Sequence, residues 1–309
     1  MLTKTHTNIG KGIAILLVIL GHILLEIYHV HTFIQSIGVF LFLILSGYGI
    51  TASVISKGSY KNIMSWFFRM EKVLVPYWLS PHFGGKIIIL ALFGSVTFSI
   101  AVILKGFFFD LDKTIDSTMW FVLYIIVWYI VSALIFFFIR NKWLMTLLFF
   151  IVAGLFIMFV DLSNWAFYAL GFPIGVLWRN YERTWSGLYD KLPASLYFIL
   201  FILLAIANTS VIKSFSLGMP TTLLAAIFVL CFVNKFFQQQ AWLEWIGKIS
   251  FELYLIEGFW LYTTKSLYVG HSSFLNLLLY LGLLLVSYLL YLGGERLLQY
   301  GPILLKKRR

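Results

Sequence analysis

Apolar runs long enough to cross the hydrocarbon core of a bilayer recur along almost the whole chain. About 18 apolar residues with few charges suffice for a spanning helix. Hydrophobic residues make up 61% of the 309 residues and charged residues 11%, against roughly 45–50% and 25% in soluble domains. The pattern predicts an all-α polytopic membrane protein. It has about ten predicted transmembrane helices, at 9–28, 33–54, 86–104, 118–139, 143–160, 164–179, 192–208, 218–234, 249–267 and 273–298.

The placement of the basic residues predicts the orientation of these spans. With the N-terminus inside, the 23 Lys and Arg residues all fall on the cytoplasmic side except Lys105, Lys113, Lys213 and Lys265. Such a bias is typical of membrane proteins and predicts that both termini are cytoplasmic. The net charge of +11 therefore indicates a lipid bilayer, and not nucleic acid, as the partner.

The apolar runs follow one another without a linker or a soluble segment long enough to fold alone. The sequence therefore predicts a single domain over residues 1–309. No internal repeat is visible, which weakens the case for a transporter built from two related halves. Cys231 is the only cysteine, so an internal disulfide or a cysteine metal cluster is excluded.

The first run contains KGIAILLVILGHILLE, residues 11–26, with three ionisable side chains. On a helix, Lys11 and His22 fall within about 20° of each other and about 16 Å apart along the axis. Glu26 follows His22 by one turn. Ionisable groups inside a membrane are functional candidates because they are unfavourable unless they face protein or water.

The histidine in this run suits acid–base chemistry. Its imidazole could take a proton from a hydroxyl and return it, while Glu26 orients the ring as the third member of a catalytic triad does. Two alternatives stay open. His22 could be bonded to a neighbouring helix in a purely structural role, and Glu26 could lie at the outer membrane interface.

A second polar segment is NIMSWFFRMEKVLVPYWLSPHFGG, residues 62–85. It predicts a short helix at the cytoplasmic interface, broken at Pro76, Pro81 and the glycine pair. Arg69 and Lys72 are three residues apart, so both cations can point the same way. They could bind the phosphates of a nucleotide-bearing donor or simply anchor the chain to anionic lipid.

Three further segments give weaker signals. LSGYGI, residues 45–50, contains Ser46 among small residues that let helices approach closely. Trp120 and Tyr124 in MWFVLY, residues 119–124, fit an aromatic belt at the outer membrane surface. Glu257 in the ninth run must either be protonated or meet a cation from another helix.

Taken in order, these pieces resemble the acyltransferase 3 family of bacterial inner-membrane acyltransferases. The resemblance covers nearly the whole chain and rests on KGIAILLVILGH, FLFLILSGYGI, FFRMEKVLVPYW, MWFVLYII and WIGKISFELYLIE. It implies a multi-pass protein of the bacterial plasma membrane. It also implies transfer of an acyl group, usually acetyl, from cytoplasmic acyl-CoA to a hydroxyl of an extracytoplasmic or lipid-linked glycan.

The resemblance also implies roles for individual residues. Acetyl-CoA is the expected donor and no metal is expected. Lys11 and Lys72 stand where arginine is common in the family, and Glu257 stands where histidine is frequent. An exporter of a glycan or its precursor is the alternative function. The candidate residues are His22, Lys11 and Glu26 for catalysis, Arg69, Lys72 and Ser46 for the donor, and Trp120 and Glu257 for the acceptor.

Overall fold

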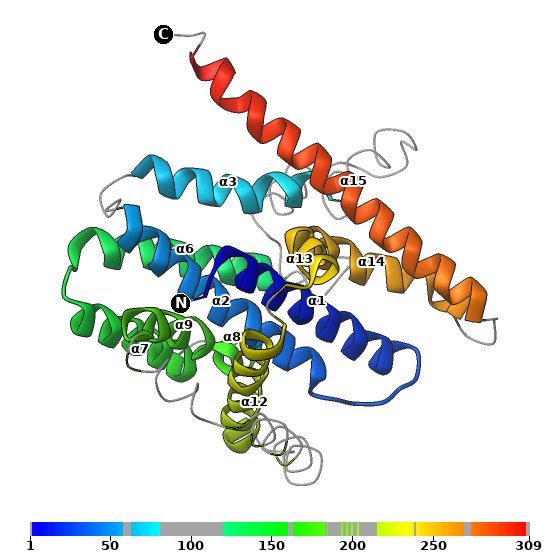
Figure 1. Ribbon diagram of the computed structural model, residues 1–309, viewed down its shortest axis with the longest axis horizontal. Coiled ribbons are helices and arrows are strands. Elements are labelled where there is room, and N and C mark those ends of the chain that lie inside the picture. Colours follow the sequence, from blue (N-terminus) through cyan, green and yellow to red (C-terminus); the bar gives the residue numbers. More distant parts are fainter. Residues whose placement is uncertain are drawn as a thin grey trace. The chain divides into compact units, whose positions relative to one another are not determined.

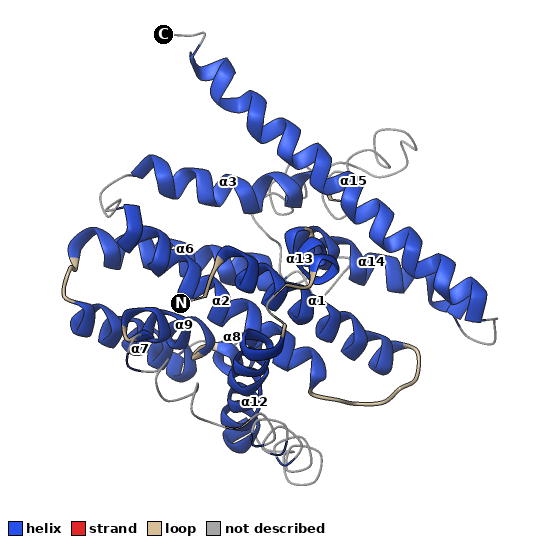
Figure 2. Cartoon of the chain, in the orientation of Figure 1, coloured by secondary structure: helices blue, strands red, loops and turns tan. Residues whose placement is uncertain are grey.

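The computed structural model describes residues 2–57, 63–80, 120–159, 163–182, 215–237, 239–268 and 273–306, with isolated positions between 184 and 203. Within these ranges the regular structure is entirely helical (Figure 2). The predicted all-α class is therefore confirmed. The predicted span 86–104 lies outside the described residues, as does 192–208 apart from isolated positions.

The described helices are shown in Figure 1. Six of them are long and apolar enough to cross a membrane, namely α1, α2, α6, α7, α12 and α15. The total of ten spans and the cytoplasmic placement of the termini stay predictions. The helix bounds are α1 Lys4–Glu26, α2 Ile34–Lys57, α3 Ile63–Leu79, α6 Trp120–Phe138, α7 Lys142–Phe159, α8 Ser163–Tyr168, α9 Gly171–Asn180, α12 Phe215–Phe236, α13 Ala241–Lys248, α14 Ser250–Tyr268 and α15 Ser273–Lys306.

Exposed apolar side chains follow one face of α7. Trp143, Leu147, Ile151 and Leu155 recur at four-residue spacing and are all exposed, so they form a continuous stripe along the helix. In water a large apolar stripe of this kind would favour association, whereas the acyl chains of a bilayer cover it at no cost in polar contacts. The outward-facing stripe therefore supports a membrane protein.

The predicted span 164–179 is wrong as a continuous helix. A turn at Ala169 and Leu170 separates α8 from α9. Pro173 is the third residue of α9, where its missing N–H is not needed because the first turn has no intrahelical acceptors. Hydropathy is continuous through this segment, which is why an apolar count alone does not reveal the break.

The predicted break at Pro76 is also wrong, because α3 continues through this residue to Leu79. Proline in a helix interior removes one backbone hydrogen bond and crowds the preceding turn. Here Pro76 is buried, and its ring carbon Cγ lies near Gly294 of α15. Packing of α3 against α15 therefore maintains a helix that the local sequence disfavours.

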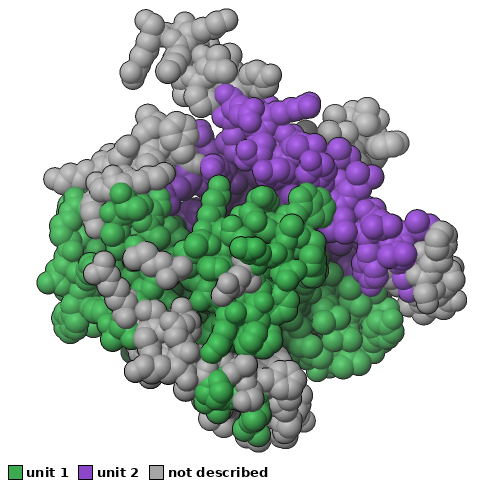
Figure 3. All heavy atoms as spheres, viewed as in Figure 1, with its two compact units in different colours: residues 1–61, 131–248 green, residues 62–130, 249–309 purple. Residues whose placement is uncertain are grey.

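The chain forms two compact units (Figure 3). Unit 1 comprises residues 1–61 and 131–248, and unit 2 comprises residues 62–130 and 249–309. In unit 1, α2 packs against both α1 and α9, and α1 also packs against α13. In unit 2, α15 packs against α3 and α14.

Glycines allow α2 and α9 to approach each other backbone to backbone. A side chain at Gly47 would overlap the carbonyl group of Phe172, and one at Gly175 would overlap the carbonyl group of Ile44. Small residues are the usual means of close helix packing within membranes. Gly47 of LSGYGI therefore serves close helix packing, as the sequence predicted, whereas the space beside Gly49 is open.

Candidate active site

Lys11 and His22 lie on the side of α1 that faces the protein. Ile15 and Val18 share this side to within about 40° and are 0% and 2% exposed. Leu20 points about 160° away from His22 and is 45% exposed. Lys11 and His22 are themselves half-buried, so the line that joins them faces protein and not lipid.

Backbone contacts hold α1 on both flanks of this side. On one flank, a side chain at Gly12 would overlap the Leu243 carbonyl, and one at Gly247 would overlap the Asn8 carbonyl, so α1 and α13 touch directly. On the other flank, Gly38 of α2 lies equally close to the backbone of α1. The Lys11–His22 line therefore runs between the surfaces of α1 that contact α13 and α2.

Glu26 is the last residue of α1, and its side chain is exposed. Because the helix continues through this position, Glu26 stays one turn beyond His22 as the sequence predicted. Its exposure fits the interfacial alternative better than a buried triad. Ser46 is half-buried on α2 in the same unit, and its assignment to the donor stays a prediction.

The two cations of α3, in unit 2, have different surroundings. The Arg69 guanidinium lies 5.1 Å from the ring centre of Trp66, a cation–π distance. Burial lowers the pKa of Arg69, which still leaves it charged because arginine titrates far above neutrality. Lys72 is exposed. Trp66, three residues before Arg69, is a partner that the sequence analysis missed although the helical spacing could have indicated it.

Trp120 begins a row of aromatic rings along α6. Its ring centre lies 5.8 Å from that of Tyr124, which lies 6.2 Å from that of Trp128. Tyr124 and Trp128 are fully buried, so Tyr124 belongs to the core and not to an aromatic belt. Trp120 is half-buried and is the outermost ring of the row.

Glu257 lies on α14 and is 0% exposed. One turn earlier, the ring of Tyr254 meets that of Phe121 on α6 at 5.4 Å between centres. The carboxyl group is therefore enclosed by protein. Its role with the acceptor stays a prediction.

The candidate residues thus form two groups, each within one unit. Lys11, His22, Glu26 and Ser46 lie in unit 1, whereas Arg69, Lys72, Trp120 and Glu257 lie in unit 2.

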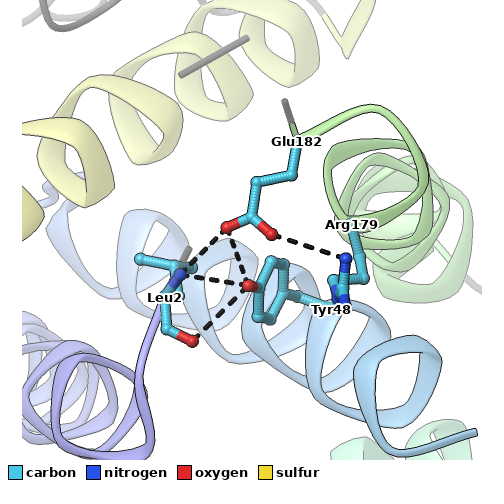
Figure 4. A network of polar contacts seen from close by, with 4 residues as sticks. All are labelled: Leu2, Tyr48, Arg179 and Glu182. Carbon is cyan, nitrogen blue, oxygen red and sulfur yellow. Dashed lines mark hydrogen bonds and ion pairs between the residues drawn. The ribbon is translucent and has the colours of Figure 1, made fainter. Parts of the chain in front are cut away.

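A polar network that the sequence analysis missed joins the N-terminal residues to α2 and α9 (Figure 4). Glu182 Oε1 accepts hydrogen bonds from the Tyr48 hydroxyl at 2.8 Å and from the Leu2 backbone N–H at 2.9 Å. Its other oxygen lies 3.5 Å from Arg179 Nη1. Tyr48 of LSGYGI therefore anchors the start of α1. The spacing of Arg179 and Glu182 is the one signal of this network in the sequence.

A family model described as an acyltransferase domain, Acyl_transf_3, matches residues 7–292. The chain belongs to the acyltransferase 3 family. No curated protein and no solved structure matches it. The acyltransferase match runs through both units and includes every candidate residue named above, so the resemblance seen in the sequence is confirmed.

Proposed function

We propose that this acyltransferase transfers an acyl group, most simply acetyl, from cytoplasmic acyl-CoA to a hydroxyl of a cell-surface or lipid-linked glycan. The family match supports acyl transfer. The observation that carries the proposal is the half-buried His22 on the inward side of a membrane-length helix. A titratable imidazole held inside a spanning helix is a candidate for proton transfer.

In the proposed reaction His22 is the general base. It takes the proton of the acceptor hydroxyl while that oxygen attacks the thioester carbonyl carbon. The tetrahedral intermediate then breaks its carbon–sulfur bond, and the leaving thiolate receives the proton from the imidazolium. The products are an ester and free CoA, and His22 is neutral again. Lys11, about 16 Å away along the helix, must act on a more distant part of the donor.

The proposed donor contacts include Arg69, whose guanidinium Trp66 holds in place. We expect Arg69→Glu to weaken binding of CoA by roughly tenfold or more, because a carboxylate repels phosphate where a guanidinium attracted it. Calorimetry of CoA binding to the purified protein measures this effect. Arg140→Glu is the control because it makes the same charge reversal at a different place. Arg140 lies at the α6–α7 connection, where it donates a hydrogen bond to the Phe136 carbonyl. Equal CoA affinity in wild type and Arg69→Glu would make Arg69 a lipid anchor.

Mass spectrometry of surface glycans from cells with and without the protein tests the proposed function. We expect the acetyl additions to disappear while the glycan itself still reaches the surface. Loss of the glycan from the surface, with acetylation unaffected on the intracellular pool, would instead indicate an exporter.

A further inference from the structure

Asn8 is a buried amide on the inward side of α1, next to Lys11. Its side chain is 9% exposed, and its Nδ2 makes no hydrogen bond to any part of the chain that the structure describes. Asn8 precedes Lys11 by three residues, so the two side chains are neighbours on the helix surface. Most buried polar atoms in proteins have a hydrogen-bond partner, so this N–H donor requires an explanation.

The backbone of Asn8 packs directly against α13. Gly247 of α13 lies directly against the Asn8 carbonyl. Asn180 provides a comparison, because it is also 9% exposed and its Nδ2 donates to Thr146 Oγ1 at 2.9 Å. Within the residues that the structure describes, the fold therefore satisfies the amide nitrogen of Asn180 but not that of Asn8.

The position of Asn8 along α1 indicates which part of acyl-CoA it can reach. Measured along the axis, Lys11 lies about 16 Å and Asn8 about 21 Å from His22. The arm between the CoA sulfur and the nearer phosphorus contains about thirteen bonds, which extend to about 15 Å if each advances as a backbone bond does. With the thioester at His22, the nearer phosphorus therefore reaches about the level of Lys11, and the second phosphate extends from there towards Asn8.

We propose that Asn8 is a donor-binding residue whose Nδ2–H donates to a phosphate oxygen of the acyl-CoA diphosphate, beside the Lys11 ammonium. This inference rests on the proposed function. A hydrogen bond to a charged phosphate is stronger than one between neutral groups. Such a bond in the complex would offset the cost of burying the Asn8 N–H without a partner among the described residues of the free protein.

The test is calorimetry of CoA binding to the full-length protein in nanodiscs of zwitterionic lipid. Asn8→Leu keeps the branching of the side chain and removes the N–H donor. We expect it to weaken CoA binding about tenfold, in line with one charge-assisted hydrogen bond, without lowering the thermal stability of the ligand-free protein. The matched control Asn180→Leu removes the hydrogen bond from Nδ2 to Thr146, so it should lower the stability and leave CoA affinity unchanged.

Pantetheine, which lacks the phosphates, should bind wild type and Asn8→Leu equally. If Asn8→Leu weakens both probes alike, the contact is with the arm and the phosphate assignment is wrong. If CoA binds Asn8→Leu as well as wild type, this inference fails while the proposed function stands. If wild type does not bind CoA at all, both fail.

A lipid phosphate offers the same chemistry as the CoA diphosphate. The measurement is therefore repeated in nanodiscs that contain anionic lipid. If Asn8 binds the donor, the tenfold difference between wild type and Asn8→Leu persists there. If anionic lipid instead lowers the CoA affinity of wild type to that of Asn8→Leu, the site holds a lipid headgroup. That result would overturn the assignment to CoA.

Discussion

Replacing His22 with alanine is expected to lower the rate of acyl transfer by about 10²–10⁴-fold, the usual contribution of a general base. The imidazole lies on the inward side of α1, where it can exchange a proton with an acceptor hydroxyl. Alanine is a good helix former, so α1 should persist. The measurement is acyl transfer by the purified protein at equal abundance in the membrane, together with CoA affinity, which should be nearly unchanged.

Leu20→Ala is the matched control for His22→Ala. Leu20 lies two residues before His22 and on the opposite, exposed side of α1, so its truncation should leave the transfer rate within about twofold, as expected for a site remote from the chemistry. A His22→Ala protein with near-normal acyl transfer would return His22 to a structural role. Acyl transfer would then need a general base other than His22.

The second large effect is expected at Gly247, where α13 touches α1. We expect Gly247→Val to reduce the free energy of unfolding by about 3 kcal/mol or more, beyond ordinary overpacking. The new side chain would overlap the Asn8 carbonyl, which is backbone and cannot rotate away. The effect is measured by heating the protein in detergent and following, by gel filtration, the fraction that still elutes as folded protein at each temperature.

Gly154→Ala is the control for Gly247→Val. Gly154 lies within α7, and the space where its Cβ would stand is open to 4 Å. Alanine in a helix interior should therefore stabilise by roughly 0.5–1 kcal/mol. If Gly247→Val unfolds at the same temperature as wild type, the direct contact between α1 and α13 does not contribute to the stability of the protein.

The contact at Gly247 also joins two of the motifs on which the family resemblance rests. Gly12 belongs to the first motif and Gly247 to the last, and a side chain at either would stand close to the backbone nitrogen of the other. The two segments, far apart along the chain, thus form one flank of the side that carries Lys11 and His22. The glycines of both motifs therefore serve packing.

Local rules account for what the sequence alone determined. Apolar length and a 3.6-residue period predicted α1 and α2 to within a few residues, because helix hydrogen bonds link residues four apart. The same period put Lys11 and His22 on one side of α1. The early start of α1 at Lys4 reflects another local device, in which the Thr3 side chain accepts from the His6 N–H.

Only the tertiary structure decided where that side of α1 faces and what anchors the helix. The answer depends on Gly247, more than two hundred residues later, and on Glu182, which is 134 residues from its partner Tyr48. The passage of α3 through Pro76 is likewise supported by packing against α15. Hydropathy and helical period describe one segment at a time, whereas a backbone-to-backbone approach or a buried hydrogen bond needs matching groups from two segments that the fold brings together.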